Sequence, residues 1–430
     1  MAKYAPLNFS LLVAALFMHC HTNHKIEAAR KVTEHANLAA LDIELQQVAD
    51  SSLIPGFAVS IVNKEKILFS NGYGYSNLKD KSNFTTQTIN SVASISKTFI
   101  GLSIMKLVDQ GKLDLDEPIN SILPYKIINP FFPGEDITVR HLVTHTSGIA
   151  QEFDPEDVGE ATIILIDSFT ENAETPAGLK KEIAYYKMGK YISIDEHIRK
   201  YTLPSGNWYS KANFLNHAPG SKFNYTNLGS LIAGRIVELK SNMSFEEFTR
   251  TQIFEPLNME NSAWSYKQSN GSLLSVLYTV DDRRNPTRVL EHPKYEMTDY
   301  PVGGLKTNVE DLTRYLVEII KGYYGKGTLL SPKAYQTLLK PQLADTCFDN
   351  RNDYVFNDQF NIGVFWSVSA PGYRMHNGGS IGVYSFIYFN PETGIGAVSF
   401  CNLPHSDFGK IRDVVHKYEK SLGESFSKKD

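Results

Sequence analysis

Runs of β-forming residues stand near both ends of this 430-residue chain, on either side of a long stretch that has few of them. The first run, GFAVSIVNKEKILFSNGYGYSN at residues 56–77, has two β-rich segments joined at Asn63 to Lys66, which is a hairpin signal. The later runs are FNIGVFWSVS, YRMHN, GVYSFIYFN and GIGAVSFCN, the last two linked by the turn NPETG. We expect both groups to join one antiparallel sheet.

The stretch between these runs has helical periodicity. It contains TVRHLVTH, NLGSLIAGRIVELK and SFEEFTRTQIF, and Ser244 with Glu247 predicts a capping box at the start of the last one. Further amphipathic helices are predicted over residues 27–50 and in SDFGKIRDVVHKYEKSL near the end. The expected fold class is α/β of the α+β type, with one domain over residues 27–425. Its α/β lobe would span 27–110 and 300–425, and a mostly helical insertion would span 111–300.

The N-terminus predicts export. Lys3 precedes the apolar segment LNFSLLVAALFMHC, which is too short to span a bilayer and has the length of a secretory h-region. We therefore expect residues 1–23 to be a signal peptide or lipoprotein signal. Cys20 stands where a bacterial lipoprotein would be cut and acylated, although His19 replaces the usual small residue. The expected location is periplasmic, either free or anchored to the membrane through Cys20.

Charge and cysteine content narrow the possible partners. The net charge is −4 and no long basic block occurs, which argues against nucleic acid as the main partner. Cys347 and Cys401 are the only cysteines besides Cys20, and we expect both to be buried thiols. No metal or other cofactor is predicted.

Four serines stand three residues before a lysine, so this spacing alone identifies no site. They are Ser76, Ser94, Ser103 and Ser425. Ser94 differs because it can begin the helix of SVASISKTFIGLSIMKLVDQG, where the helix dipole favours developing negative charge and Lys97 lies one turn away. A lysine packed among Ile95, Phe99 and Leu102 could take a proton from that serine. The simpler alternative is that Ser94 caps the helix and Lys97 extends to solvent.

Two later segments favour a catalytic site over that alternative. In APGSKFNYTNLGSLIAG, Tyr225 and Asn227 stand at the start of a helix after a Pro-Gly turn. In RMHNGGSIG, His376 is followed by Gly378 and Gly379, and glycines there allow a backbone N–H to approach a ligand closely. His-x-Gly occurs only once in the chain.

Taken in order, these segments resemble the motifs of the serine β-lactamase and penicillin-binding-protein superfamily, whose first motif is Ser-x-x-Lys. The match is nearest to the class C-like branch, with Tyr-x-Asn second and Lys-Thr-Gly or His-x-Gly third. Here these are Ser94 to Lys97, Tyr225 to Asn227, and His376 to Gly378. The stretches GYGYSN, GKLDLDEPI, HLVTHTSGI and VGGLKTNVEDLTRYL add to the resemblance, which covers about residues 40–420.

The resemblance implies acyl transfer. Ser94 would attack a carbonyl, Lys97 and Tyr225 would exchange its proton, and Asn227 would orient the substrate. Backbone N–H groups of Ser94 and Gly379 would form the oxyanion hole. His376 departs from the antibiotic-hydrolysing pattern, because a histidine is charged only when protonated and a lysine there is charged permanently. Efficient β-lactam hydrolysis is therefore not expected.

Three functions remain open at this point. The first is a D,D-carboxypeptidase or D-peptidase-like enzyme acting on a small-molecule or peptide substrate, including one derived from peptidoglycan. The second is a carboxylesterase or β-lactamase of the same fold. The third, from a different class, is a non-catalytic penicillin-binding-like sensor or scaffold, since a fold does not establish activity.

Two other patterns are predicted to be structural. GGSIG matches a nucleophile elbow around Ser380, but only Glu392 precedes the downstream His405 and no parallel βαβ series leads to this serine. His141 and His145 have the spacing of a zinc helix, yet no glutamate follows His141 and no third ligand is evident. We expect the two histidines to pack the helix and the turn after it.

Overall fold

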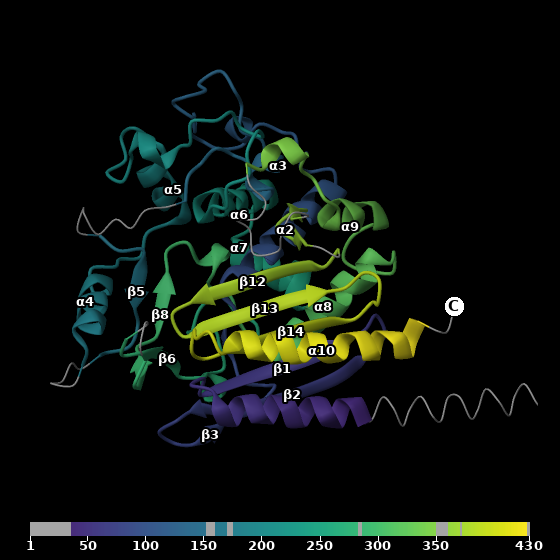
Figure 1. The fold of residues 1–430 in the computed structure, drawn as a ribbon. Helices are drawn as coiled ribbons and strands as arrows, with labels where there is room; N and C mark the ends of the chain where they lie inside the picture. The colour runs from purple at the N-terminus through teal and green to yellow at the C-terminus, as the bar shows by residue number, and fades with distance from the viewer. Residues whose placement is uncertain are drawn as a thin grey trace, which may run out of the picture.

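The computed structural model describes residues 36–151, 160–169, 175–282, 286–349, 360–369 and 372–427. The predicted signal segment, with Cys20, lies outside these residues. One eight-stranded antiparallel sheet joins the two ends of the described chain, as predicted, and confirms the fold class (Figure 1). Its strands, in spatial order, are β10 (Asn361–Ile362), β11 (Ser367–Val368), β12 (Arg374–Ser380), β13 (Val383–Phe389), β14 (Gly396–Cys401), β1 (Gly56–Val62), β2 (Ile67–Asn77) and β3 (Ser82–Asn83).

The joint between the two ends is the pairing of β1 with β14, in which Phe57 lies opposite Cys401. The predicted hairpin is present, and the Asn63 N–H donates to the Lys66 carbonyl at 3.0 Å to close it. One expected strand is shorter than its sequence indicates. In FNIGVFWSVS only β10 and β11 form, because the segment between them turns at Phe365, whose φ is +55°.

Helices cover both faces of the sheet. On the outer face lie the helix over residues 36–51 and α10 (Phe408–Ser427), which run side by side in Figure 1. Their apolar side chains, such as Leu45 and Ile411, pack against Phe57 and Phe386 of the sheet. β1 is buried along its whole length because both of its faces are covered.

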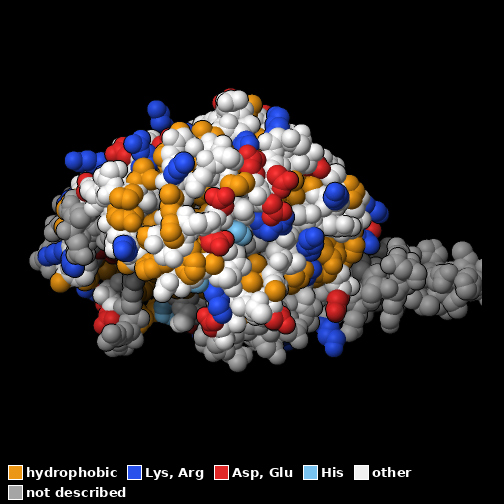
Figure 2. Space-filling view, turned by 90° about the horizontal axis from the view of Figure 1, so that it is seen from above, with side chains coloured by type: hydrophobic (Ala, Val, Ile, Leu, Met, Phe, Trp, Pro, Cys, Tyr) orange, Lys and Arg blue, Asp and Glu red, His pale blue; other side chains and the backbone are white. Residues whose placement is uncertain are grey.

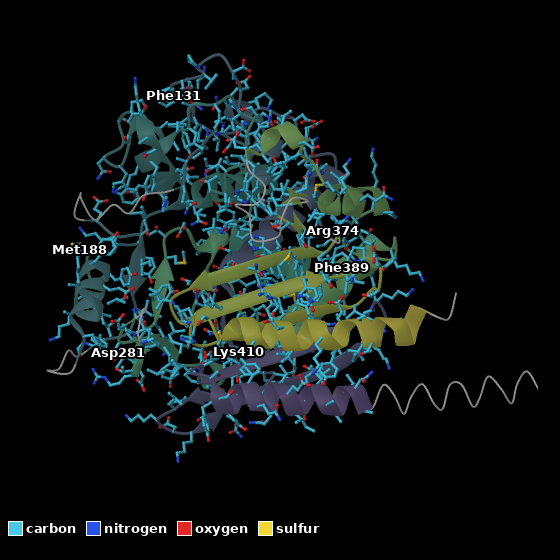
Figure 3. The ribbon with its side chains drawn as sticks, in the orientation of Figure 1. Phe131, Met188, Asp281, Arg374, Phe389 and Lys410 are labelled. Atoms are coloured by element: carbon cyan, nitrogen blue, oxygen red, sulfur yellow. The ribbon has the colours of Figure 1, made fainter. Side chains whose placement is uncertain are left out.

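The inner face packs against α8 (Val309–Tyr323), and behind it lies α2 (Ser96–Asp109), which is buried along nearly its whole length. Figure 3 labels Phe389 and Arg374, which lie opposite each other in the β12–β13 pair, at the end of the sheet nearest α8 and α9 (Pro332–Leu339). The same figure shows Phe131 and Met188 at the periphery of the molecule. α2 therefore connects the sheet to the helical part of the molecule.

The middle of the chain forms helices and several two-stranded pairs. The helices are α3 (Val139–Val143), α4 (Ala177–Tyr186), α5 (Ile194–Thr202), α6 (Asn227–Ser241) and α7 (Phe245–Thr249). The short strands are β4 (Asn90–Ser91), β5 (Ile163–Leu165), β6 (Leu277–Val280), β7 (Val289–His292), β8 (Tyr295–Met297) and β9 (Lys306–Thr307); the pairs are β4–β9, β5–β8 and β6–β7.

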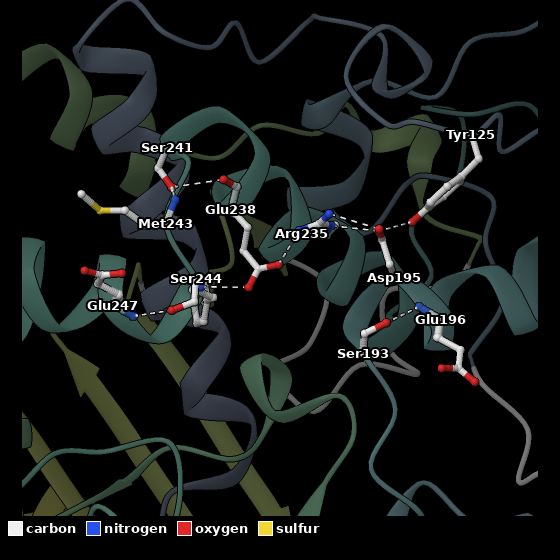
Figure 4. Close-up of polar contacts among 11 residues, drawn as sticks. Tyr125, Ser193, Asp195, Glu196, Arg235, Glu238, Ser241, Met243, Ser244 and Glu247 are labelled. Carbon is white, nitrogen blue, oxygen red and sulfur yellow. Dashed lines mark hydrogen bonds and ion pairs between the residues drawn. The ribbon is translucent and has the colours of Figure 1, made fainter.

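A polar network holds α5 and α6 together (Figure 4). Arg235 of α6 contacts Asp195 of α5 at 2.9 Å and Glu238 of its own helix at 2.9 Å. Glu238 in turn accepts a hydrogen bond from the backbone of Phe245 in α7. At the start of α7 only half of the predicted capping box forms. The Ser244 hydroxyl accepts from the Glu247 N–H at 3.1 Å, but the Ser244 N–H does not donate to the Glu247 carboxylate.

The face of the molecule that is seen from above the view of Figure 1 carries both apolar and charged side chains. Figure 2 shows hydrophobic side chains gathered toward the left of this face and charges of both signs over its middle. Within the described residues, no helix combines the length and hydrophobicity that a membrane span requires. Cys347 and Cys401 are free and buried, which confirms the expectation for these two thiols.

Candidate active site

Ser94 stands on a sharp turn that leads into α2. The chain leaves β4, and Ala93 adopts φ = +47°, a left-handed conformation that is rare for a residue with a side chain. A 3₁₀ turn, η1 (Ala93–Ile95), then joins directly to α2. Such strain persists only where the surrounding structure imposes it, and it is often found at active sites. The turn places the Ser94 side chain, partly exposed, at the start of a buried helix.

Two side chains donate hydrogen bonds to the Ser94 hydroxyl oxygen. Lys97 Nζ lies 3.1 Å from Ser94 Oγ, and the Tyr225 hydroxyl lies 3.0 Å from the same atom. Lys97 is the second residue of α2, one turn after Ser94, whereas Tyr225 comes from a segment 131 residues further along the chain. The structure thus brings together the three side chains that the sequence assigned to the chemistry.

Lys97 does not extend to solvent, as the simpler alternative required. Its side chain is fully buried, and Nζ also donates to the Val302 carbonyl at 2.8 Å. Val302 belongs to a second 3₁₀ turn, η7 (Tyr300–Val302). The ammonium nitrogen also lies 5.1 Å from the centre of the Tyr225 ring. These contacts fix Nζ beside Ser94 and Tyr225.

Tyr225 and Asn227 lie at the N-terminus of α6, as predicted. Thr226 caps the helix by accepting from the Gly229 N–H at 3.3 Å. Tyr225 is 37% exposed. Asn227 is partly exposed, and its side-chain amide makes no hydrogen bond within the described part of the chain, which leaves it available to a ligand. Its backbone N–H donates to the Gln151 side chain.

Gly378 on β12 lies directly against the Ser94 backbone. A Cβ atom at this position would lie 3.1 Å from the Ser94 nitrogen and 2.3 Å from both the Val92 carbonyl oxygen and Ser385 Oγ. Only glycine allows this approach, and a close backbone approach is what we expected of the glycines in this segment. Gly379 follows as the next residue of the strand, at an exposed position.

His376, two residues before Gly378, is buried and neutral. Burial lowers its pKa to about 4, with a further contribution from the nearby Lys97 charge; a hydrogen bond to the Asn377 carbonyl opposes the shift. In that bond Nδ1 lies 2.7 Å from the carbonyl oxygen, so Nδ1 carries the proton and Nε2 has a lone pair. The ring therefore offers a substrate carboxylate no positive charge near neutral pH.

The competing serines are occupied by other contacts. Ser380 Oγ lies 2.7 Å from the Tyr295 hydroxyl, and burial raises the Tyr295 pKa to about 12, so this phenol is not a base near neutral pH. Ser103 donates to the Phe99 carbonyl of its own helix, and Ser76 donates to the Ser82 carbonyl. The side chain of Ser425 lies outside the residues described.

The two histidines of HLVTHTSGI have different surroundings. His141 Nδ1 accepts from the Thr138 N–H at 3.2 Å, and its ring lies under Gly220, as expected for a packing residue. His145 lies instead against the ring of Tyr225, with 4.5 Å between ring centres. Among the described residues no cluster of three or more metal-ligating side chains is present.

Sequence reasoning missed two parts of this site. The Val302 carbonyl was not identified as a partner for Lys97, although VGGLKTN was noted, because a backbone acceptor has no residue-type signal. The contact of His145 with Tyr225 was also missed. Here the signal was HTSG directly after a short helix, a segment that places the histidine at φ = +54°.

Comparison with known proteins agrees with this geometry. The profile of the Beta-lactamase family matches residues 41–419. A curated relative, Protein flp of Staphylococcus aureus strain N315, is 25% identical over 357 residues, which cover 81% of this chain and 60% of the relative. The chain thus spans less than two thirds of the length of that relative.

Solved structures share the fold. The octameric penicillin-binding protein homologue from Pyrococcus abyssi superposes with a TM-score of 0.65 at 24% identity, over 90% of this chain and 77% of that one. The D-amino acid amidase from Ochrobactrum anthropi SV3, solved with L-phenylalanine amide, gives a TM-score of 0.62 at 18% identity, over 90% and 100% of the two chains. These matches and the family profile confirm the predicted superfamily.

Proposed function

The chain belongs to the Beta-lactamase family, and from this premise we propose that it is a serine hydrolase with Ser94 as its nucleophile. The observation that carries the proposal is the pair of hydrogen bonds to one hydroxyl: Lys97 Nζ at 3.1 Å and the Tyr225 hydroxyl at 3.0 Å. Either group is close enough to take the Ser94 proton once it has lost its own.

The proposed reaction has two steps. In the first, Ser94 Oγ bonds to the carbonyl carbon of an amide or ester while its proton passes to Lys97 or Tyr225. The bond to the leaving group then breaks, and that proton moves to the departing nitrogen or oxygen. In the second step water attacks the acyl-enzyme, releases the acid and restores the Ser94 hydroxyl.

We assign the oxyanion hole to the backbone N–H groups of Ser94 and Gly379. The close approach of β12 to the Ser94 backbone at Gly378 supports this assignment. Fixed N–H donors stabilise the negative charge that develops on the carbonyl oxygen, and losing one typically lowers the rate by ~10²–10³. Asn227, with its free side-chain amide, is proposed to orient the substrate.

We propose that the enzyme is most nearly a D,D-peptidase-like or related amide hydrolase, and we place an esterase second. The neutral His376 offers no positive charge to the carboxylate of a β-lactam, which argues against efficient β-lactam hydrolysis. A D-Ala-D-Ala terminus also carries a carboxylate, so the same argument favours a related amide hydrolase over a strict D,D-carboxypeptidase. Support for an amide comes from the His-x-Gly motif and from the structural similarity to a D-amino acid amidase. A peptide or small molecule derived from peptidoglycan would fit the predicted export. Fractionation of cells that express the wild type and Cys20→Ala would test export and anchoring.

Covalent labelling tests the nucleophile. Purified wild type, Ser94→Ala and Ser103→Ala are incubated with a fluorescent fluorophosphonate and with a fluorescent penicillin. Ser103 is a matched control because it also precedes a lysine by three residues on α2, but it bonds to its own helix. We expect fluorophosphonate to label wild type and Ser103→Ala, and not Ser94→Ala. Absence of a Ser94-dependent adduct with either probe would instead favour a non-catalytic sensor or scaffold.

Turnover separates the enzymatic alternatives. A D-Ala-D-Ala peptide, short p-nitrophenyl esters and nitrocefin are assayed in parallel, with Ser94→Ala as the blank. Peptide cleavage that depends on Ser94 would support the first assignment. Turnover of the esters alone would eliminate the peptidase and support the esterase.

A further inference from the structure

His145 occupies a strained position inside an aromatic cage. Its φ of +54° is in the left-handed region, and its side chain is 1% exposed. The ring lies 4.5 Å from the ring of Tyr225, 5.2 Å from Phe365 and 6.0 Å from Phe223, measured between centres. A residue held in such a conformation indicates that the surrounding structure requires it there.

The backbone on both sides of Tyr225 is bonded to this one residue. The Asn224 N–H donates to the His145 carbonyl at 2.7 Å. The Thr226 N–H donates to His145 Nδ1 at 3.3 Å. The peptide units before and after Tyr225 are thereby fixed to the same histidine that packs against its phenol ring at a tilt of 35°.

The second ring nitrogen of His145 has no partner within the described residues. Because Nδ1 accepts a hydrogen bond, the neutral ring carries its proton on Nε2, and this N–H is buried without an acceptor. Native structures rarely leave a buried N–H unpaired, so an orphan of this kind requires an explanation. Backbone strain and an unpaired donor therefore coincide at one residue that contacts the site.

Among the described residues, the buried ring packed against the phenol of Tyr225 is that of His145. Tyr225 is 37% exposed, and its hydroxyl bonds only to Ser94 within the described chain. Lys97 lies over its ring at 5.1 Å, but Lys97 is itself part of the reacting group. The ring of His145 is the buried support against which the phenol rests.

We propose that His145 is a positioning residue, which holds the Tyr225 hydroxyl at Ser94 Oγ by binding the backbone on both sides of Tyr225 and packing against its ring. The inference rests on the proposed function, because it takes Tyr225 to be a proton-transfer group. His145 itself makes no hydrogen bond to Ser94.

Asparagine is the informative replacement. It tolerates a positive φ, and its side-chain oxygen can accept the Thr226 N–H in place of Nδ1, so His145→Asn removes mainly the ring that packs against Tyr225. His141→Asn is the matched control, because His141 also accepts a backbone N–H through Nδ1 but does not contact Tyr225. His145→Gly is a second variant, since glycine adopts φ = +54° without strain and retains the carbonyl that binds Asn224.

Kinetics form the first readout, with p-nitrophenyl butyrate turnover and fluorophosphonate labelling as probes. We expect Tyr225→Phe to lower kcat by ~10²-fold and His145→Asn by ~10-fold or more, with KM within about threefold of wild type. The double variant should be no slower than Tyr225→Phe, because both changes remove the same function. Added imidazole should restore part of the rate of His145→Gly, while His141→Asn should stay within about twofold of wild type.

Two kinetic results would overturn the inference: kcat of His145→Asn within about twofold of wild type, or losses that multiply in the double variant. NMR provides a readout that needs no activity. Proteins labelled with [¹³Cζ]tyrosine are compared in the Ser94→Ala background, with the Tyr225 signal assigned by its loss in Tyr225→Phe. His145→Asn should shift this signal and His141→Asn should not.

An unshifted signal would refute the positioning role whatever the kinetics. A shifted signal, together with no Ser94-dependent labelling of the otherwise wild-type protein by either probe, would support the positioning of the phenol and overturn the proposed function. The failures of the two proposals are thus distinguishable.

Discussion

Two buried lysines, one just after β4 and one on its partner strand β9, have similar surroundings. Lys97 follows β4, is fully buried, and donates to the Val302 carbonyl. Lys306, on β9, is also buried, donates to the Gly304 carbonyl at 2.9 Å, and lies 4.5 Å from the centre of the Tyr266 ring. The difference is the third contact: Lys97 reaches a serine hydroxyl, whereas Lys306 reaches only the Trp264 carbonyl.

This difference shows that burial and a perturbed pKa do not identify a catalytic lysine. Burial lowers the pKa of Lys306 to about 8, opposed by the charge of Glu296, so a search for perturbed groups would select it. Yet no hydroxyl or thiol accepts a hydrogen bond from Lys306 within the described residues. Geometry relative to a nucleophile distinguishes the two lysines.

Removing each lysine should give the largest contrast. We expect Lys97→Ala to lower the rate of fluorophosphonate labelling at Ser94 by ~10²–10⁴-fold with the fold intact, because the hydroxyl loses a proton acceptor. Lys306→Met should label within about threefold of wild type. Stopped-flow labelling and circular dichroism provide the measurements. If Lys97→Ala labels at the wild-type rate, Lys97 has no part in the proton transfer.

The backbone around Ser94 provides the next contrast with Lys306. Strand β12 approaches Ser94, the serine that is bonded to Lys97. Gly378→Ala would place a Cβ 2.3 Å from the Val92 oxygen and force β12 away from the Ser94 nitrogen. We expect turnover of p-nitrophenyl butyrate to fall by ~10²–10³-fold. Gly178→Ala is the control, because a Cβ there meets nothing within 4 Å. Unchanged turnover in Gly378→Ala would rule out a fixed oxyanion hole at this strand.

The pH dependence of stability should reveal the burial of His376 beside Lys97. The pKa of His376 is lowered to about 4 in the folded protein, from ~6.5 in an unfolded chain. The unfolded state therefore binds more protons between these values, and the contribution to stability is lost as pH falls from ~6.5 to ~4, by up to about 3 kcal/mol. Urea unfolding at pH 4 and 7 should show a smaller pH effect in His376→Asn than in wild type. An equal pH effect in both proteins would contradict a neutral, buried His376.

Replacing Lys306 should give the smallest change in the free energy of unfolding at pH 7. Its pKa of about 8 lies below the ~10.5 of an exposed lysine, so the unfolded state binds more protons between these values and stability should rise with pH in that window. Because a buried charge is replaced by an apolar chain, we expect Lys306→Met to change the free energy of unfolding by less than ~1 kcal/mol at pH 7. The rise between pH 8 and 10 should also be reduced. A loss of several kcal/mol would show that the bonds of Lys306 to the two carbonyls hold this part of the fold together.

Much of the fold and part of the site could be predicted because their signals are local. The hairpin of β1 and β2, the helix α6 and the start of α2 follow from periodicity and turn residues within a few positions. One segment departs from this pattern. FNIGVFWSVS has the composition of a strand, but Phe365 adopts a positive φ that its residue type does not reveal.

The sequence by itself determined that helices separate two groups of strands, and that Ser94, Lys97, Tyr225 and His376 occur in the order of the family's motifs. Periodicity, capping and short motifs depend on neighbours along the chain, so they can be found in a single sequence. Only the tertiary structure decided that Tyr225 reaches Ser94 from 131 residues away and that the Val302 carbonyl holds Lys97. It also placed His145 against the phenol, since contacts between distant segments depend on packing that no local pattern encodes.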